Sequence, residues 1–250
     1  NQRDPRCGKG DFFSERLIFG GLLWAYMDAK QPFPQTLWRY VMWSDLSMVW
    51  QAAFAEGWEA FKRGSVPIGA AICDENGTII CTGRNRRGEL TGGNRRIAHA
   101  ETDCLFRLDT KKYPDFRGFA LYACMEPCPM CMGTLVMSGL RRLRAAARDG
   151  YCGAVHYRDF SRYIKSKNID VIFEGGDTEL VQLTMQIYYE LKRIDESHSG
   201  KTVIECFTAD CPLARTIAED LYNNRVLDRY AAKNADFSEV FDLILSYKNH

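Results

Sequence analysis

The chain has 250 residues and an almost balanced charge, with 33 Lys and Arg against 32 Asp and Glu, for a formal net charge of +1. A dedicated nucleic-acid binder usually carries a clear basic excess, so the overall charge argues against that class. Hydrophobic residues make up 46% of the chain, enough for one large core with appendages. The apolar run at residues 19–27 is too short to span a bilayer, and we expect no association with a membrane.

The N-terminal segment is rich in aromatic residues. Residues 1–43 contain Trp24, Tyr26, Trp38 and Trp43, a content too aromatic for a disordered tail. We therefore expect residues 1–43 to form an extension that packs on the core, ahead of a catalytic domain at residues 44–195.

The catalytic domain begins with a helix and a hairpin. Apolar residues recur at helical spacing over residues 44–63. Two apolar runs, residues 66–73 and 78–81, then flank a segment that contains Asn76-Gly77. Because Asn-Gly between apolar runs is a strong hairpin signal, these runs are expected to form an antiparallel pair of strands.

Strands and helices alternate after the hairpin. This alternation predicts a three-layer α/β/α domain. The expected strands lie at residues 119–125, 143–147 and 169–173, and the expected helices at residues 98–108, 157–167 and 180–193.

The last part of the chain reads as a separate appendage. A linker is expected at residues 195–200, followed by helical patterns around residues 214–230 and 237–246. Residues 196–250 are thus predicted to form a mainly helical C-terminal extension. Such an extension covers the core, builds a dimer interface or caps the substrate entrance, and the sequence does not decide among these roles.

A histidine and two cysteines have the spacing of a catalytic zinc site. His99 stands in His99-Ala100-Glu101, and Cys128 and Cys131 stand in Pro-Cys-Pro-Met-Cys. One imidazole and two thiolates suit zinc and leave the fourth coordination position for water. Glu101 lies two residues past a ligand, where it can move protons without binding the metal. The combination is typical of zinc-dependent nucleobase deaminases. The alternative is a structural zinc knuckle or a redox pair of cysteines.

Several motifs together resemble the cytidine deaminase superfamily, and within it the branch of transfer-RNA adenosine deaminases, guanine deaminases and fungal cytosine deaminases. They are Val66-Pro67-Ile68-Gly69-Ala70, Gly83-Arg84-Asn85, His99-Ala100-Glu101 and Glu126-Pro127-Cys128-Pro129-Met130-Cys131. The resemblance implies a mixed five-stranded sheet with helices on both faces. It implies a reaction in which water replaces an exocyclic ring amine and ammonia is released.

The resemblance also implies roles for particular residues. His99, Cys128 and Cys131 match the zinc ligands of the family, and Glu101 matches its proton shuttle. Candidate substrate contacts are the Asn85 side chain, the Ala100 backbone N–H and the Glu126 backbone C=O.

The motifs leave the substrate open between a nucleobase or nucleoside and a transfer RNA. Arg86 and Arg87, beside the flexible loop at residues 88–94, are candidate phosphate contacts, with a solvated surface loop as the alternative. A non-catalytic zinc-binding partner subunit is a third reading, but such a protein has no need of Glu101. We expect a homodimer.

Ten cysteines bear on the compartment. Buried free thiols are the expected state of the eight cysteines outside the motif. The spacing of Cys206 and Cys211 and the Asn76-Gly77-Thr78 sequon allow a secreted protein. We expect a cytoplasmic enzyme, with secretion as the alternative.

Overall fold

The computed structural model describes residues 42–194 and 198–249. Contacts divide the chain into two units, residues 1–39 and 40–250, and every described residue belongs to the second unit. The predicted packing of the N-terminal extension, apart from Met42 and Trp43, therefore falls outside the described residues.

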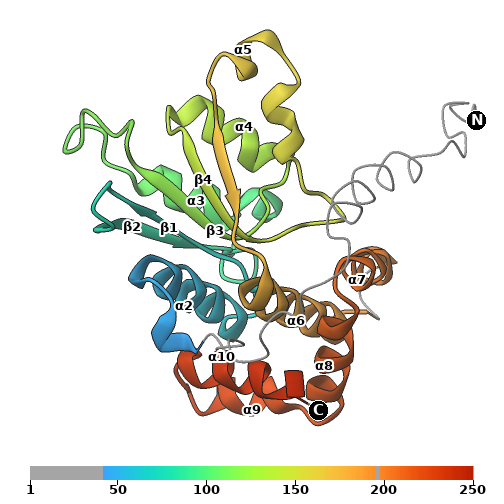
Figure 1. The fold of residues 1–250 in the computed structure, drawn as a ribbon. Coiled ribbons are helices and arrows are strands. Elements are labelled where there is room, and N and C mark those ends of the chain that lie inside the picture. Colours follow the sequence, from blue (N-terminus) through green and yellow to red (C-terminus); the bar gives the residue numbers. More distant parts are fainter. Residues whose placement is uncertain (1–41, 195–197, 250) are drawn as a thin grey trace, which may run out of the picture. The chain divides into compact units, whose positions relative to one another are not determined.

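One five-stranded sheet forms the centre of the second unit (Figure 1). Its order is β2-β1-β3-β4-β5; β1 is antiparallel to β2 and β3, and β3, β4 and β5 are parallel. The mixed sheet expected from the resemblance is confirmed. The strands are β1 Gly69–Cys73, β2 Ile79–Arg84, β3 Ala120–Met125, β4 Arg142–Ala147 and β5 Asp170–Phe173.

Helices cover both faces of this sheet. Alternate residues of β1 enter different cores: Ala71 packs on the α2 and α6 side, and Ile72 packs on the α3 and α4 side. A strand that is buried on both faces is apolar throughout. The three predicted layers are confirmed, and their main helices are α2 Met48–Lys62, α6 Gly176–Lys192, α3 Ala100–Arg107 and α4 Pro129–Ser138.

The C-terminal extension is helical, as predicted, and adds a layer outside α2 and α6 (Figure 1). The predicted linker at residues 195–200 is shorter than expected, because α7 already begins at His198. The single helical pattern at 214–230 is two helices that break at Arg225, whose φ is +51°. The helices are α7 His198–Asp210, α8 Pro212–Asn223, α9 Val226–Ala232 and α10 Phe237–Ser246.

The prediction of one continuous helix at residues 157–167 was wrong. A 3-10 helix, Val155–Asp159, is followed by a short helix α5, Arg162–Lys165. The Ser161 side chain accepts a hydrogen bond from the Ile164 N–H and caps the start of α5. Serine at such a position favours a new helix start over a continuous helix.

Two further features of the described residues bear on expectations from the sequence. No helix of residues 42–194 and 198–249 is long and apolar enough to cross a membrane. The nine cysteines in these ranges are all free thiols, as expected for the ones that fall in the core.

Candidate functional site

His99, Cys128 and Cys131 come together from the starts of two helices. His99 is the N-cap of α3, Cys128 is the N-cap of α4, and Cys131 lies in the first turn of α4. Both Sγ atoms lie 3.5 Å from His99 Nδ1, and the two Sγ atoms lie 3.6 Å apart. The spacing seen in the sequence therefore converges on one point, although both helices begin slightly later than expected.

The three ligand atoms fit a zinc ion. With zinc–sulfur bonds of about 2.3 Å and zinc–nitrogen bonds of about 2.0 Å, tetrahedral coordination separates neighbouring ligand atoms by roughly 3.5–3.8 Å. The observed separations of 3.5 and 3.6 Å match these edges. A soft and borderline donor set of two thiols and one imidazole also favours zinc over the hard cations.

The backbone of β2 lets α3 approach closely enough to place His99. A Cβ atom at Gly83 would lie 2.3 Å from Cys104 N and 2.8 Å from Ala100 O. Any residue with a side chain would push the first turns of α3 away from the sheet. The glycine of the Gly83-Arg84-Asn85 motif thus sets the depth of one metal ligand.

The thiols and the imidazole shift one another's pKa. The hydrogen bond with Cys131, together with the contact with His99, lowers the pKa of Cys128 to about 4, despite the opposing effect of burial. The hydrogen bond to Cys128 and burial raise the pKa of Cys131. Contact with Cys128 raises the pKa of His99. One thiolate therefore forms readily even before a cation stabilises the second.

Glu101 is buried beside these ligands. It lies in the first turn of α3 and is 4% exposed. Burial raises the pKa of its carboxyl to about 6, and the charge of His99 partly opposes this shift. A carboxyl group with a pKa near the working pH can both take up and release a proton.

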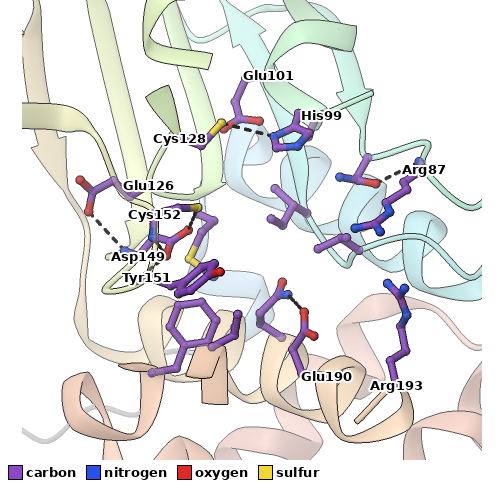
Figure 2. A pocket seen from close by; sticks show the side chains of 18 residues that line it. Arg87, His99, Glu101, Glu126, Cys128, Asp149, Tyr151, Cys152, Glu190 and Arg193 are labelled. Atoms are coloured by element: carbon purple, nitrogen blue, oxygen red, sulfur yellow. Dashed lines mark hydrogen bonds between the residues drawn. The ribbon is translucent and has the colours of Figure 1, made fainter. Parts of the chain in front are cut away.

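A cavity of about 220 Å³ opens onto His99, Glu101 and Cys128. Figure 2 shows these residues on one side of the cavity. Glu190 of α6 and Arg193, the C-cap of α6, lie on the opposite side. Drug-sized ligands usually occupy about 300–1,000 Å³, so this cavity suits a smaller molecule. The remaining lining residues are Val66, Ile68, Asn85, Arg87, Ala100, Met125, Glu126, Asp149, Tyr151, Cys152, Gln186, Val203 and Phe207.

The structure brings Asn85, Ala100 and Glu126 to this cavity. Asn85 is 3% exposed, and its Oδ1 accepts a hydrogen bond from the Arg87 N–H at 3.0 Å. This turn directs the side-chain oxygen to the backbone, so Asn85 can offer its amide N–H group to a ligand. Ala100, at the first position of α3, has a backbone N–H of the kind that no carbonyl within the helix satisfies.

The two candidate phosphate contacts, Arg86 and Arg87, lie in different surroundings. Arg87 lines the cavity, whereas Arg86 does not. The Arg86 guanidinium instead lies 3.9 Å from carboxylate oxygens of Glu89 and Asp103. Neighbouring Arg84 forms ion pairs with Glu56 and Glu89. Much of the basic charge beside the loop is thus matched by carboxylates.

Comparison with known proteins identifies the family. Residues 44–147 match the family described as the cytidine and deoxycytidylate deaminase zinc-binding region. A tRNA-specific adenosine deaminase of Aquifex aeolicus is 37% identical over 109 residues, which are 42% of this chain and 68% of that protein. The chain belongs to the cytidine and deoxycytidylate deaminase family.

Other relatives in this deaminase family differ in substrate and in the length matched. A probable cytosine deaminase of Schizosaccharomyces pombe is 38% identical over 34% of this chain and 49% of its own length. A solved structure from work on tRNA:A34 deaminases shares 28% identity over 56% of this chain and 99% of its own, with a TM-score of 0.46. Guanine deaminase from Bacillus subtilis shares 29% identity over 40% of this chain and 63% of its own, with a TM-score of 0.35.

The deaminase family match ends before one whole side of the cavity. Gln186 and Glu190 come from α6, Arg193 is the C-cap of α6, and Val203 and Phe207 come from α7, all after residue 147. No motif predicts them. A signal was present in the four-residue spacing of Gln182, Gln186 and Glu190 along α6. This spacing places the three polar side chains along one helical face.

The loop after β4 contributes a second set of residues that no motif predicts. The Glu126 side chain accepts hydrogen bonds from the backbone N–H groups of Asp149 and Val155. These bonds fix the segment that brings Asp149, Tyr151 and Cys152 to the cavity (Figure 2). Glu126 was expected to act only through its backbone carbonyl, and its side chain has this additional structural role. His156 is exposed and does not line the cavity.

Proposed function

We propose that the protein is a zinc-dependent hydrolytic deaminase, which replaces the exocyclic ring amine of a nucleobase or nucleoside with oxygen and releases ammonia. The observation that carries this proposal is the convergence of His99, Cys128 and Cys131 beside the buried Glu101 in one small cavity. A structural zinc knuckle has no need of a buried carboxyl group beside its ligands. The membership of the chain in a deaminase family supports the same reaction.

His99, Cys128 and Cys131 would hold the zinc ion. When bound, the ion supplies the positive charge that lowers the pKa of a water molecule to about 7. Glu101 would take a proton from the attacking water and deliver protons to the ring nitrogen and to the departing amine. The overall exchange balances, because one water and one ring amine give one ring carbonyl and one ammonia.

Other groups of the chain hold the ring while protons move. The Asn85 amide N–H group and the Ala100 backbone N–H donate to ring acceptors, and the Glu126 backbone carbonyl accepts from a ring N–H. The helices α6 and α7 close the opposite side, with Val203 and Phe207 as apolar lining. Closure of the site keeps bulk water from competing for the proton.

A small substrate fits the cavity better than an RNA loop. The cavity holds about 220 Å³ and is bordered by α6 and α7. Of the two candidate phosphate contacts, Arg86 lies beside the carboxylates of Glu89 and Asp103, and Arg87 remains at the cavity. The several tRNA-specific adenosine deaminases among the relatives keep transfer RNA as the alternative substrate.

We also propose a homodimer in the cytoplasm. Large apolar side chains are exposed on the α3 and α4 side of the sheet, and Tyr163 Oη contacts Met137 Sδ there at 3.8 Å. A second copy would cover this surface. The thiols Cys128 and Cys131 must stay reduced to bind a metal, which favours a reducing compartment. The exposed side chains are Ile97, Phe106, Met137, Phe160 and Tyr163.

The experiment measures ammonia release by the zinc-loaded protein from cytosine, guanine, adenine, their nucleosides and nucleotides, and transfer RNA. Glu101→Gln is the matched control, because it keeps the shape of the side chain and removes the carboxylate. We expect turnover of a small substrate by the wild type and a loss of at least about 100-fold in Glu101→Gln with zinc content unchanged. Release from transfer RNA alone would support the alternative, and silence across the panel would refute a deaminase of these rings.

A further inference from the structure

Gln186 places an unpartnered polar atom at the cavity. It lies on α6, is 5% exposed and lines the cavity. Its Oε1 is buried and has no hydrogen-bond partner among the described residues. A buried acceptor without a partner costs free energy, so we expect a molecule bound at the cavity to supply the donor.

Glu190 fixes the direction in which this amide faces. Gln186 Nε2 donates a hydrogen bond to Glu190 Oε1 at 2.9 Å, one helical turn further along α6 (Figure 2). Burial raises the pKa of the Glu190 carboxyl. In its ionised form this carboxylate only accepts hydrogen bonds, so the amide then turns its nitrogen toward Glu190. The amide oxygen, Oε1, is then left without a partner in the described part of the chain. Rotation of the amide by half a turn would exchange Oε1 and Nε2 and would break the hydrogen bond with Glu190.

Two other buried polar side chains of α6 do not share this position. Gln182 Nε2 donates to the Pro67 carbonyl at 3.0 Å and ties α6 to the segment before β1. Thr184 Oγ1 is buried and unpartnered among the described residues, but Thr184 does not line the cavity. Of these three residues, Gln186 alone combines an unpartnered acceptor with a place on the cavity surface.

The position of α6 decides which end of a substrate Gln186 can contact. Figure 2 shows Glu190, its hydrogen-bonded partner, across the cavity from His99, Glu101 and Cys128. The amine-bearing carbon of the substrate must lie beside Glu101 and the metal ligands. The α6 side therefore faces the end of the ring that is remote from the amine.

The chemistry of that remote end distinguishes free bases from nucleosides. In cytosine and in adenine, the nitrogen that bears the sugar in a nucleoside lies on the far side of the ring system from the amine-bearing carbon. In the free base this nitrogen carries a hydrogen and is a donor, and in the nucleoside it has none. A buried acceptor on a residue that lines this end of the cavity matches the free base.

We infer that Gln186 Oε1 accepts a hydrogen bond from the ring N–H that is replaced by the sugar in nucleosides, so that the protein selects free nucleobases. Glu190 is a positioning residue that holds the Gln186 amide in this orientation. The inference rests on the proposed deaminase function and deepens it. The cavity volume of about 220 Å³ and the apolar side chains of Val203 and Phe207 restrict the space for a sugar at this end.

The test measures binding by calorimetry in the zinc-loaded Glu101→Gln protein, which does not consume its ligand. The probes are matched pairs that differ at one nitrogen: cytosine and 1-methylcytosine, and adenine and 9-methyladenine, together with the nucleosides. For the base that binds, we expect its N-methyl partner to bind about 10-fold more weakly, since one donor is lost and Oε1 stays unpaired. The nucleoside should bind at least as weakly as the methylated base.

Gln186→Met, added to the same protein, removes the acceptor and keeps the side-chain length. We expect it to bind the free base about 10-fold more weakly and to abolish most of the preference over the methylated base. Thr184→Val is the matched control, because it removes a buried unpartnered oxygen of the same helix outside the cavity and should leave both affinities unchanged.

Three results would overturn the inference: no binding of any free base, equal binding of base and nucleoside, or an undiminished preference in Gln186→Met. A failure of the proposed function is separate, because it would appear as absent ammonia release from the wild type while free bases still bind with the expected preference.

Discussion

Arg84 and Glu89 form a two-point ion pair in which Arg84 Nε and Nη2 lie 2.8 and 3.0 Å from the two carboxylate oxygens of Glu89. Arg84 Nη1 also contacts Glu56 Oε2 at 3.0 Å. The Glu89 side chain is 11% exposed. This pair holds the start of the loop at residues 88–94 against β2 and α2, close to the Asn85 side of the cavity.

Glu89→Gln should lower the free energy of unfolding at pH 7 by about 1–3 kcal/mol, because it leaves Arg84 with a weaker partner. The hydrogen bond from Arg84 lowers the pKa of Glu89. The ionised pair therefore stabilises the fold above the unfolded pKa of about 4.3, and this contribution is lost as the pH falls through the lower, folded pKa. Urea unfolding of both proteins from pH 7 to pH 3 would measure the difference.

The matched control for this pair is Glu59→Gln. Glu59 pairs with Lys62 and Arg63 at the surface, and its side chain is 38% exposed. Exposed pairs contribute about 0–1 kcal/mol, so this variant should change stability little. A loss in Glu89→Gln that is equal to the control, or that does not shrink at acid pH, would contradict a stabilising role for the Arg84 pair.

Gly153→Ala should disturb the segment after β4. A Cβ atom at this position would lie 2.5 Å from the Asp149 carbonyl oxygen and 2.5 Å from Glu126 Cδ. We expect a loss of about 1–3 kcal/mol in the free energy of unfolding, and a higher KM because Asp149 and Tyr151 line the cavity. Thermal unfolding and steady-state kinetics would test this.

Gly133→Ala is the control for that substitution. Gly133 lies within α4, where an added Cβ meets nothing within 4 Å. Alanine is favoured over glycine inside a helix by about 0.5–1 kcal/mol, so this variant should be slightly more stable and fully active. If Gly153→Ala behaves like Gly133→Ala, the loop tolerates the added atom and Glu126 does not fix its position.

The parts of the site that could be predicted from the sequence are the local ones. His99 and Glu101 are two residues apart, and Cys128 and Cys131 are three apart, so each pair is placed by a single helix start. The strands that carry these helices are short apolar runs bounded by turns, and their alternation with helices predicts the three layers. The mixed sheet came from the resemblance, because spacing alone does not fix strand direction.

The rest could not be predicted, because it depends on packing between distant segments. Gln186 and Phe207 reach the cavity only because α6 and α7 pack beside the sheet end, 85 or more residues beyond Glu101 in the chain. Arg86 and Arg87 are neighbours in sequence, yet only Arg87 lines the cavity. Arg86 lies beside the carboxylates of Glu89 and Asp103. The position of Asp103 relative to Arg86 depends on the packing of α3 against β2, which the sequence does not show.

Removal of the metal should inactivate the protein and weaken the fold around it. The thiols of Cys128 and Cys131 lie 3.6 Å apart and would repel each other as thiolates without a cation. We expect a chelator to abolish ammonia release and lower the melting temperature, and zinc alone to restore both. Cys131→Ser should bind zinc more weakly and lose more than about 100-fold in activity. This is more than the loss expected when a residue that only hydrogen-bonds to a metal ligand is replaced. Full activity after verified zinc removal would refute the metal-dependent mechanism.

Phe106→Glu should separate a dimer into monomers. Phe106 is 94% exposed on α3, on the same side of the sheet as Met137 and Phe160. A charge placed at the centre of an apolar interface leaves an unpaired buried group and weakens association. Light scattering after size exclusion would give the mass in solution. Met48→Glu, an exposed apolar residue of α2 on the opposite side, is the control, and a monomeric wild type would refute the proposed dimer.

Glu190→Gln tests whether Glu190 acts by holding Gln186. A glutamine at position 190 offers both an acceptor and a donor, so the Gln186 amide can face either way and present its nitrogen to the substrate half of the time. We expect a KM for the free base that is a few-fold higher with kcat unchanged, because Glu190 does not touch the reacting carbon in the proposed pose. A lower kcat with an unchanged KM would instead place Glu190 in the chemical step. An unchanged KM and kcat together with the unaltered preference for a free base would show that other contacts orient Gln186.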